Sequence, residues 1–242
     1  MVRRINKMEN KMKIYVPRTE VAEKIARSLE SEIANLEVAR HPFLQKFSDH
    51  GMSHEQLQTF APQWYRVITA HKRAFAGLIY HTPDERLRAD LTAILYDECG
   101  NGDPDKKHTE MWLKVPESIG LSRKQVRVTP AIPSMTEFSR YVNENWGSSD
   151  NPTKSYGIVF LFEKIGVDFH TSFLKGLEKS NLPEVALSYS RLHTIAEEEH
   201  AKRIVNGLAL YADKADQLRA GLEGGAKVMK ELWDGFDRLV YK

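Results

Sequence analysis

Late in the chain, two histidines and a glutamate are spaced so that all three project from one side of a helix. They are His193, Glu197 and His200, in the segment SRLHTIAEEEHAKRI. Each residue of an α-helix advances about 100°, so offsets of four and seven residues return to nearly the same bearing. Apolar residues continue this stripe in both directions: Val185, Ala186, Tyr189, Ile204 and Leu208. Because buried polar groups are costly without a partner, the pattern favours a bound metal ion.

Three further polar residues interrupt apolar helical stripes in the same way. Glu98 closes one amphipathic segment, His108 lies in the first turns of the next, and Glu163 lies inside the apolar segment YGIVFLFEKIGVDFHTSF. Carboxylate oxygens and imidazole nitrogens together suit first-row metal ions. Structural zinc sites rely on cysteine and hydrolytic zinc sites need fewer ligands, so iron is favoured, although manganese would accept the same ligands. This six-residue set predicts two metal ions: Glu98, His108, Glu163, His193, Glu197 and His200.

Each member of the six-residue set also has a structural alternative. The last three residues could form a histidine–glutamate network at the surface. Glu98 could face solvent at a helix C-terminus, although a negative charge there opposes the helix dipole. Glu163 could pair with a buried arginine, because an unpaired carboxylate in its place would be expensive. His108, taken alone, is an ordinary histidine near a helix N-terminus.

Two other histidines and the single cysteine lie near this set. His170 follows Glu163 by seven residues and could reach the same cavity, but a core histidine with satisfied hydrogen bonds is the simpler interpretation. His71, in the segment TAHKRAF, is equally ambiguous. Cys99, beside Glu98, is interpreted as a small buried residue.

The composition indicates a cytoplasmic protein without a nucleic-acid or membrane partner. The 242 residues carry 35 basic and 33 acidic side chains, for a net charge of +2. Such a balanced surface serves neither nucleic acid nor an anionic membrane. The single cysteine excludes an internal disulfide and fits a reducing compartment. No apolar run approaches the length of a membrane span.

Apolar residues spaced at threes and fours predict an all-α fold of seven to eight helices in a single domain. Residues 1–16 lack this periodicity and are expected to form a flexible extension, so that the helical domain spans 17–242. The segment 152–179 is apolar nearly all round, which is typical of a central helix. The expected helices cover about 19–40, 53–80, 83–98, a segment that starts at 103, 134–146, 152–179, 184–211 and 213–241.

Capping signals mark several of the expected helix ends. Ser53 and Ser134 each open a capping-box pattern. Pro83 is expected at the first position of its helix. The last helix is expected to be interrupted at Gly224 and Gly225.

Taken in order, the six-residue set resembles the metal ligands of the haem-oxygenase-like di-iron oxidases and oxygenases, which are related to the TenA/PqqC-like fold. The resemblance extends from about Pro42 to Leu208 and includes the phrases YDECGNGDPDKKH and FLFEKIG. It implies a seven-helix bundle, two iron ions and O₂ as co-substrate. The metal ligands themselves are the expected catalytic residues, and no separate acid or base is assigned.

The resemblance also implies how the ligands are shared. One iron would be held by Glu98, His108 and Glu163, or by a subset of these. The other would be held by the helix that carries the last three residues of the set, and one carboxylate would bridge the two ions. A homodimer and an external electron donor of unknown identity are further expectations.

Several functions fit this resemblance. The leading hypothesis is oxidation of a small aliphatic substrate, an amino acid or a fatty-acid-like molecule, by hydrogen abstraction with C–C cleavage or desaturation. N-oxygenation of an amine is the alternative among the di-iron enzymes. A metal-free enzyme of the TenA/PqqC type and a non-catalytic metal-binding bundle are the alternatives outside them.

Three departures from the family pattern bear on that choice. Glu197 stands where members of this family often carry aspartate, and its side chain is one methylene longer. Members that N-oxygenate amines tend to carry an additional glutamate on an earlier core helix, whereas the segment RVITAHKRAF contains no acid. Leu44 occupies the position expected for the tyrosine that one member converts to para-aminobenzoate, which argues against self-sacrifice.

Overall fold

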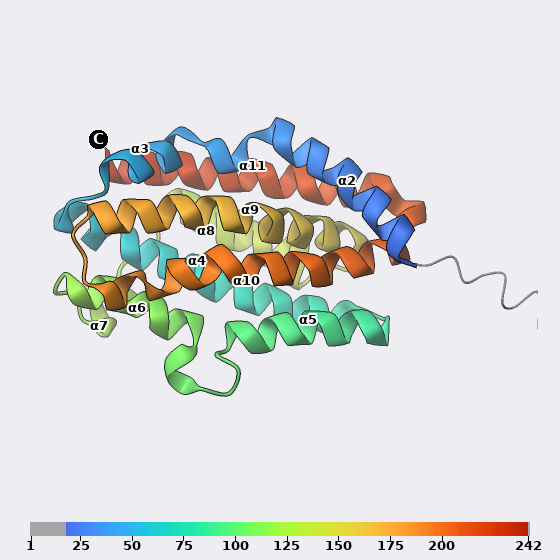
Figure 1. The fold of residues 1–242 in the computed structure, drawn as a ribbon, viewed down its shortest axis with the longest axis horizontal. Coiled ribbons are helices and arrows are strands. Elements are labelled where there is room, and N and C mark those ends of the chain that lie inside the picture. The colour runs from blue at the N-terminus through green and yellow to red at the C-terminus, as the bar shows by residue number, and fades with distance from the viewer. Residues whose placement is uncertain (1–17, 242) are drawn as a thin grey trace, which may run out of the picture.

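The computed structural model describes residues 18–241, which fold as helices joined by short connections (Figure 1). No strand occurs in this range, and the expected all-α fold is confirmed. The expected N-terminal extension, residues 1–16, lies outside the described residues. The α-helices are α2 (Arg18–Leu36), α3 (Pro42–His50), α4 (His54–His81), α5 (Glu85–Glu98), α6 (His108–Ser118), α7 (Arg123–Val128), α8 (Pro133–Val142), α9 (Pro152–Lys179), α10 (Glu184–Leu208) and α11 (Ala215–Val240). The shorter 3₁₀ and π elements are η1 (Val38–Arg40), η2 (Pro104–Lys106), η3 (Asn143–Gly147) and η4 (Ala209–Lys214).

Helix α9 is the centre of the fold. It packs against α10, α11 and α3, and Figure 1 shows it between α10 and α11. Residues on every side of α9 are buried, which confirms the central helix predicted for 152–179. Helix α4 completes the core through an aromatic cluster, in which Trp64 stacks on Trp233 and packs edge-on against Phe173. Aromatic pairs of this kind contribute about 0.5–1.5 kcal/mol beyond burial alone.

The ends of the helices follow the capping signals only in part. The capping box that begins at Ser53 is present and opens α4. Two other signals were interpreted wrongly. Helix α5 begins at Glu85, so Pro83 is not its first residue; Asp84 is the N-cap, because its carboxylate accepts a hydrogen bond from a backbone N–H of the first turn. Helix α8 begins at Pro133, so Ser134 lies inside its first turn and caps nothing.

The structure adds two short helices and removes an expected break. Helices α3 and α7 have nine and six residues, lengths too short for a clear apolar periodicity. The expected helix 19–40 ends as an α-helix at Leu36, since Glu37 adopts a left-handed backbone with a φ of 53°. Helix α11 continues through Gly224 and Gly225, because tertiary packing along α9 overrides the low helix propensity of glycine.

Helices α9 and α11 approach each other closely at two glycines. A Cβ atom at Gly157 would overlap the carbonyl oxygen of Leu218, and one at Gly221 would overlap the carbonyl oxygen of Lys154. Backbone atoms in two packed helices cannot move aside individually. Only glycine therefore permits this helix pair to pack as closely as it does.

Gly157→Ala is expected to lower the free energy of unfolding by about 1–3 kcal/mol, because the added methyl group forces α9 and α11 apart. Chemical denaturation followed by circular dichroism measures the effect. Gly224→Ala on α11 is the matched control, since its added Cβ meets the hydroxyl end of the Tyr141 side chain, which can move. An unchanged unfolding midpoint for Gly157→Ala would contradict the close approach.

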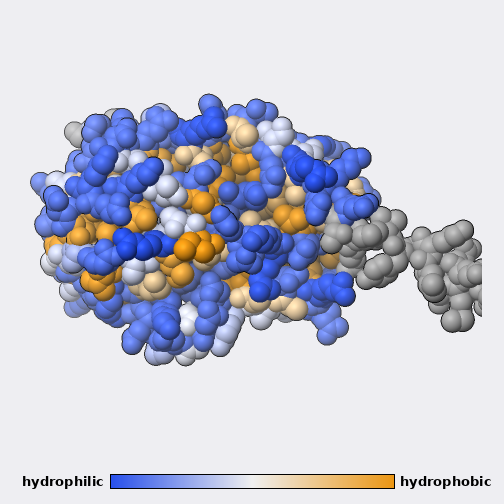
Figure 2. All heavy atoms as spheres, in the orientation of Figure 1, coloured by the Kyte–Doolittle hydropathy of each residue, from blue (hydrophilic) through white to orange (hydrophobic). Residues whose placement is uncertain are grey.

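The face of the molecule drawn in Figure 2 is mainly hydrophilic. Figure 2 shows one face of the molecule with apolar residues in patches between hydrophilic ones. Val185 on α10 is 54% exposed, so its expected place on the inward stripe was wrong. Within residues 18–241, no helix is both long enough and apolar enough to cross a membrane.

Candidate metal centre

The structure brings the six-residue set together in the protein interior. Glu98 ends α5, His108 begins α6, Glu163 lies midway along α9, and the other three residues lie on α10. The exposed fractions of all six lie between 1% and 6%. A surface network and a solvent-facing Glu98 are thereby excluded.

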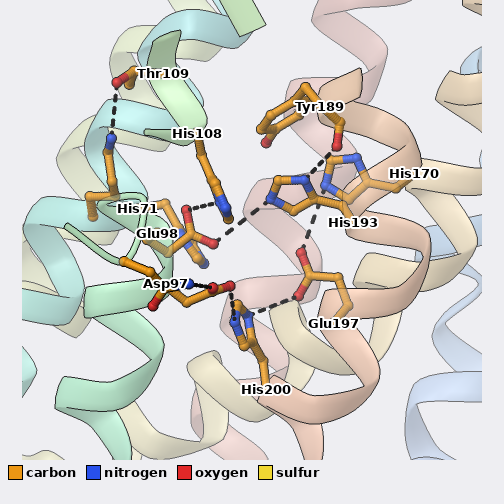
Figure 3. A network of polar contacts seen from close by, with 12 residues as sticks. His71, Asp97, Glu98, His108, Thr109, His170, Tyr189, His193, Glu197 and His200 are labelled. Atoms are coloured by element: carbon orange, nitrogen blue, oxygen red, sulfur yellow. Dashed lines mark hydrogen bonds and ion pairs between the residues drawn. The ribbon is translucent and has the colours of Figure 1, made fainter. Parts of the chain in front are cut away.

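Glu98, His108 and His193 form a first trio, whose ligand atoms lie within 4.8 Å of one another. His108 Nδ1 lies 2.9 Å from Glu98 Oε2, and His193 Nε2 lies 3.8 Å from Glu98 Oε1 (Figure 3). The connection from α5 to α6 turns at Gly100 and Gly102, whose φ angles of 87° and 85° favour glycine. This turn allows the end of α5 and the start of α6 to face the same side of α10.

Glu163, Glu197 and His200 form a second trio, again with ligand atoms within 4.8 Å of one another. His200 Nδ1 lies 3.2 Å from Glu163 Oε2 and 3.8 Å from Glu197 Oε2. The set is thus divided differently from the expected sharing, because His193 belongs with the first trio and Glu163 with the second.

The antiparallel arrangement of α9 and α10 explains this division. Residues 180–183 join the two helices, and a connection this short makes neighbouring helices antiparallel. A Cβ atom at Gly166 would lie 2.7 Å from Glu197 Cγ, and the rings of His170 and His193 have centroids 4.4 Å apart. Residues that follow one another along α9 therefore face residues that come progressively earlier along α10. The opposed pairs are Glu163 with His200, Gly166 with Glu197, and His170 with His193.

Two imidazoles are oriented by hydrogen bonds on their outer sides. His193 Nδ1 donates to the carbonyl oxygen of Tyr189 at 2.7 Å, which leaves Nε2 for the first trio. His200 Nε2 lies 3.1 Å from Asp97 Oδ2, which leaves Nδ1 for the second trio. Such outer partners fix the tautomer and the ring orientation of metal-binding histidines. Asp97 was not predicted, although its place directly before Glu98 was visible in the sequence.

Several atoms of the two trios lack the hydrogen bonds that buried polar atoms normally make. Among the described residues, His108 Nδ1, His200 Nδ1 and both carboxylate oxygens of Glu163 have no hydrogen-bond partner. They lie near other ligand atoms, but not in hydrogen-bond geometry. Unsatisfied buried polar atoms are rare in native proteins. Three carboxylates and three imidazoles that converge in this way fit two first-row metal ions.

Neighbouring imidazoles keep two of the buried carboxylates ionised. Burial alone would raise the pKa of Glu98, but the charge interaction with His108 lowers that pKa well below its ordinary value. Burial would likewise raise the pKa of Glu163, but His200 and His71 lower it to about 2. Both side chains therefore offer charged oxygens to a metal ion at neutral pH.

Protons are retained at two other residues of the six-residue set. Burial, followed by the negative charge of Glu163, raises the pKa of Glu197 well above its ordinary value. Burial alone would lower the pKa of His200, but its hydrogen bond to Asp97 and its contacts with Glu163 raise it. Metal ligands must be deprotonated, so a metal ion bound by Glu197 and His200 would displace protons from both side chains.

Metal affinity is therefore expected to rise with pH, by about tenfold per pH unit for each proton displaced. At low pH, Glu197 and His200 hold their protons and these compete with the metal ion; this competition weakens as the pH rises. Anaerobic calorimetric titration with Fe²⁺ in two buffers of different ionisation enthalpy counts the protons released. Equal binding heats in the two buffers, or an affinity independent of pH, would contradict this assignment.

The two histidines that the sequence left ambiguous line the same inner cavity as the trios. His71 Nε2, from α4, lies 3.4 Å from Glu163 Oε1. His170 is buried with Nε2 3.8 Å from Glu197 Oε1, and its Nδ1 finds no hydrogen-bond partner within residues 18–241, so it is not the satisfied core histidine that was expected. Cys99 is exposed, which corrects its interpretation as a buried residue.

A cavity and a groove are lined in part by residues of the trios. A cavity of about 40 Å³ borders Glu98, His193 and Glu197. Much of its remaining wall is apolar: Val67, Ile68, Phe162 and Met229. A groove of about 440 Å³ lies between α2, α9 and α10 and extends to Glu163 and Glu197. Glu163 also lines the inner cavity, so Glu163 and Glu197 border both the cavity and the groove.

A family model matches residues 58–234, a span that holds both trios and most of the chain. The description of that family is iron-containing redox enzyme. The chain belongs to this family. The resemblance inferred from the order of the six residues is therefore confirmed at the level of the family.

Individual proteins and solved structures are also similar to this chain. The 4-aminobenzoate synthase of Chlamydia pneumoniae is 22% identical over 213 residues, which cover 85% of this chain and 90% of that protein. A TenA homologue from Pseudomonas syringae matches in structure with a TM-score of 0.71 at 14% identity, over 88% of this chain and 93% of that one. A domain with a haem-oxygenase-like fold from Shewanella denitrificans matches with a TM-score of 0.64 at 18% identity, over 93% of both chains. The expected haem-oxygenase-like fold is confirmed, with more helices than the seven expected.

Proposed function

We propose that this protein is a non-haem di-iron enzyme that uses O₂ to oxidise a small aliphatic substrate, an amino acid or a fatty-acid-like molecule. The proposed reaction is hydrogen abstraction that leads to C–C cleavage or desaturation. The observation that carries the proposal is the pair of buried trios, in a chain of an iron-containing redox family, beside a largely apolar cavity.

The donor atoms suit iron at both trios. The first trio offers two imidazoles and one carboxylate, and the second offers two carboxylates and one imidazole. When bound, the ions would supply the redox chemistry toward O₂. The chain contributes ligand placement, since the carbonyl group of Tyr189 and the carboxylate of Asp97 orient the two α10 histidines. The buried surroundings contribute the exclusion of water.

The apolar lining of the cavity supports the proposal that the reacting part of the substrate is aliphatic. Away from the trios, Val67, Ile68 and Phe162 surround the cavity, so a hydrocarbon segment placed there would meet apolar walls and the ligand side chains. A volume of about 40 Å³ holds only a small group. A substrate of several carbons must therefore widen the cavity on binding, and the unbranched side chain of Met229 adapts to such a change most readily.

Desaturation sets the number of electrons that a partner must supply. Removing two hydrogen atoms from the substrate yields two electrons and two protons, whereas reduction of O₂ to two water molecules consumes four of each. Two further electrons and two protons must come from outside the substrate. We therefore propose an external reductant as a partner, and the homodimer expected from the resemblance stays a prediction.

Two of the alternative functions lack the residues that they would need. A metal-free enzyme of the thiamine-degrading type would need a nucleophilic cysteine, but the single cysteine, Cys99, is exposed and does not line the cavity. Conversion of the protein's own tyrosine to an aminobenzoate is not supported at position 44, where Leu44 is fully buried and carries no hydroxyl group. N-oxygenation of an amine is the second candidate reaction for the same metal site.

Anaerobic titration with Fe²⁺, followed by rapid mixing with O₂, tests the proposed function. We expect about two iron ions per chain and a transient visible absorption after O₂ is added. Aliphatic amino acids and fatty acids are then screened for acceleration of the decay of that absorption, with primary amines as the N-oxygenation arm. A wild-type protein that binds no iron tightly and shows no transient would contradict the proposal.

A further inference from the structure

His170 lies inside the site but belongs to neither trio. It follows Glu163 on the same stripe of α9 and faces His193 on α10, with the two ring centroids 4.4 Å apart. Its side chain is only 2% exposed. Aromatic rings surround the imidazole: Trp64, Phe169, Phe173 and Tyr189. A phenylalanine would suit these surroundings without carrying any polar atom into the core.

Neither ring nitrogen of His170 has a hydrogen-bond partner among the described residues. Its Nδ1 is buried, and no hydrogen-bond partner for it occurs in the described part of the chain. Its Nε2 lies 3.8 Å from Glu197 Oε1, which is longer than a hydrogen bond. A buried imidazole in this state is destabilising unless something binds it. The position of His170 therefore indicates a ligand.

The neighbours of His170 identify that ligand as a metal ion. One ligand atom from each of His170, His193 and Glu197 lies within 4.8 Å of the others. His193 also belongs to the first trio, so this residue links the His170 group to that trio. Glu197 connects the two positions, because its Oε1 faces His170 Nε2 and its Oε2 faces His200 Nδ1, each at 3.8 Å.

We propose that His170 is a seventh protein ligand, which completes the metal position of the first trio from the side of α9. The proposal rests on the proposed function, because it assigns a further residue to the same metal centre. The first position then holds three imidazoles, those of His108, His170 and His193. The second trio holds one imidazole, that of His200, and is richer in oxygen.

Copper provides a probe that counts these imidazoles without any measurement of activity. Imidazole nitrogen is a preferred ligand of Cu²⁺, so one equivalent of Cu²⁺ added to the metal-free protein should occupy the first position. Pulsed electron paramagnetic resonance detects each coordinated imidazole. We expect signals from three imidazoles in the wild type and from two in His170→Phe. Copper affinity is expected to fall about 10- to 100-fold or more in the variant.

Two further measurements separate a ligand from a packing residue. The midpoint of thermal unfolding of metal-free His170→Phe should equal or exceed that of the wild type, since the variant buries no unpaired ring nitrogen. His170→Gln, which keeps a polar side chain, should also lose one imidazole signal. His71→Phe is the matched control, because His71 borders the same cavity but belongs to none of the ligand groups, and its imidazole count should stay at three.

Two imidazoles in the wild type, or an unchanged count in both His170 variants, would overturn the role of His170. This result is distinct from failure of the proposed function. The latter would appear as a wild-type protein that binds no iron tightly, whatever the copper signal shows.

Discussion

Glu163→Gln is expected to remove binding of the iron ion at the second trio and to abolish O₂ uptake. Both carboxylate oxygens of Glu163 are buried without a hydrogen-bond partner in the described residues, and its pKa of about 2 keeps it charged. Glutamine preserves the shape but removes the charge and one acceptor oxygen. We expect the affinity of this position for Fe²⁺ to fall by more than about 100-fold. Anaerobic Fe²⁺ titration and an oxygen electrode measure the two effects.

The first trio should still bind one iron in Glu163→Gln, which distinguishes loss of a ligand from general unfolding. Glu198→Gln is the matched control, because Glu198 is an exposed glutamate on α10, next to Glu197 in sequence. It should bind two ions like the wild type. Two tightly bound ions and normal O₂ uptake in Glu163→Gln would show that Glu163 is a structural residue.

Gly166→Ala is expected to displace the Glu197 side chain of the second trio through a steric effect alone. A Cβ atom at this position would lie 2.7 Å from both Cγ and Cδ of Glu197 and 2.9 Å from its Oε2. The glycine therefore provides the space that the glutamate side chain occupies. We expect Gly166→Ala to weaken iron binding at the second trio by about tenfold or more, since a displaced ligand loses its metal geometry. Iron stoichiometry and affinity provide the measurement.

Shortening the opposing side chain should compensate for the added methyl group. Aspartate at position 197 lacks one methylene, so Gly166→Ala combined with Glu197→Asp should bind iron better than Gly166→Ala alone. A double-mutant cycle measures this coupling. Effects of the two substitutions that simply add, without rescue, would contradict direct packing of Glu197 on Gly166.

The fold was largely predictable because the sequences of the long helices show apolar patterns and capping motifs. The apolar segment 152–179 became the central helix, and the capping box at Ser53 opens α4 as expected. The errors arose where tertiary packing decides the outcome. Helix α11 passes through Gly224 and Gly225 because it packs on α9, and α3 is too short to show a period.

Within the site, the sequence predicted which residues come together but not how they divide. Spacing along one helix fixes the face that His193 and His200 share, and both are buried. The spacing of residues within α9 or within α10 does not determine the register between the two helices. It is the register that sets Glu163 against His200 and brings His170, interpreted from sequence as an ordinary core histidine, against His193.

Anomalous diffraction from crystals loaded with Fe²⁺ under anaerobic conditions tests the central claim most directly. We expect two peaks at the iron absorption edge. One should lie among Glu98, His108 and His193, and the other among the residues of the second trio. A single peak, or iron bound only at the protein surface while both trios keep their present arrangement, would contradict the di-iron centre.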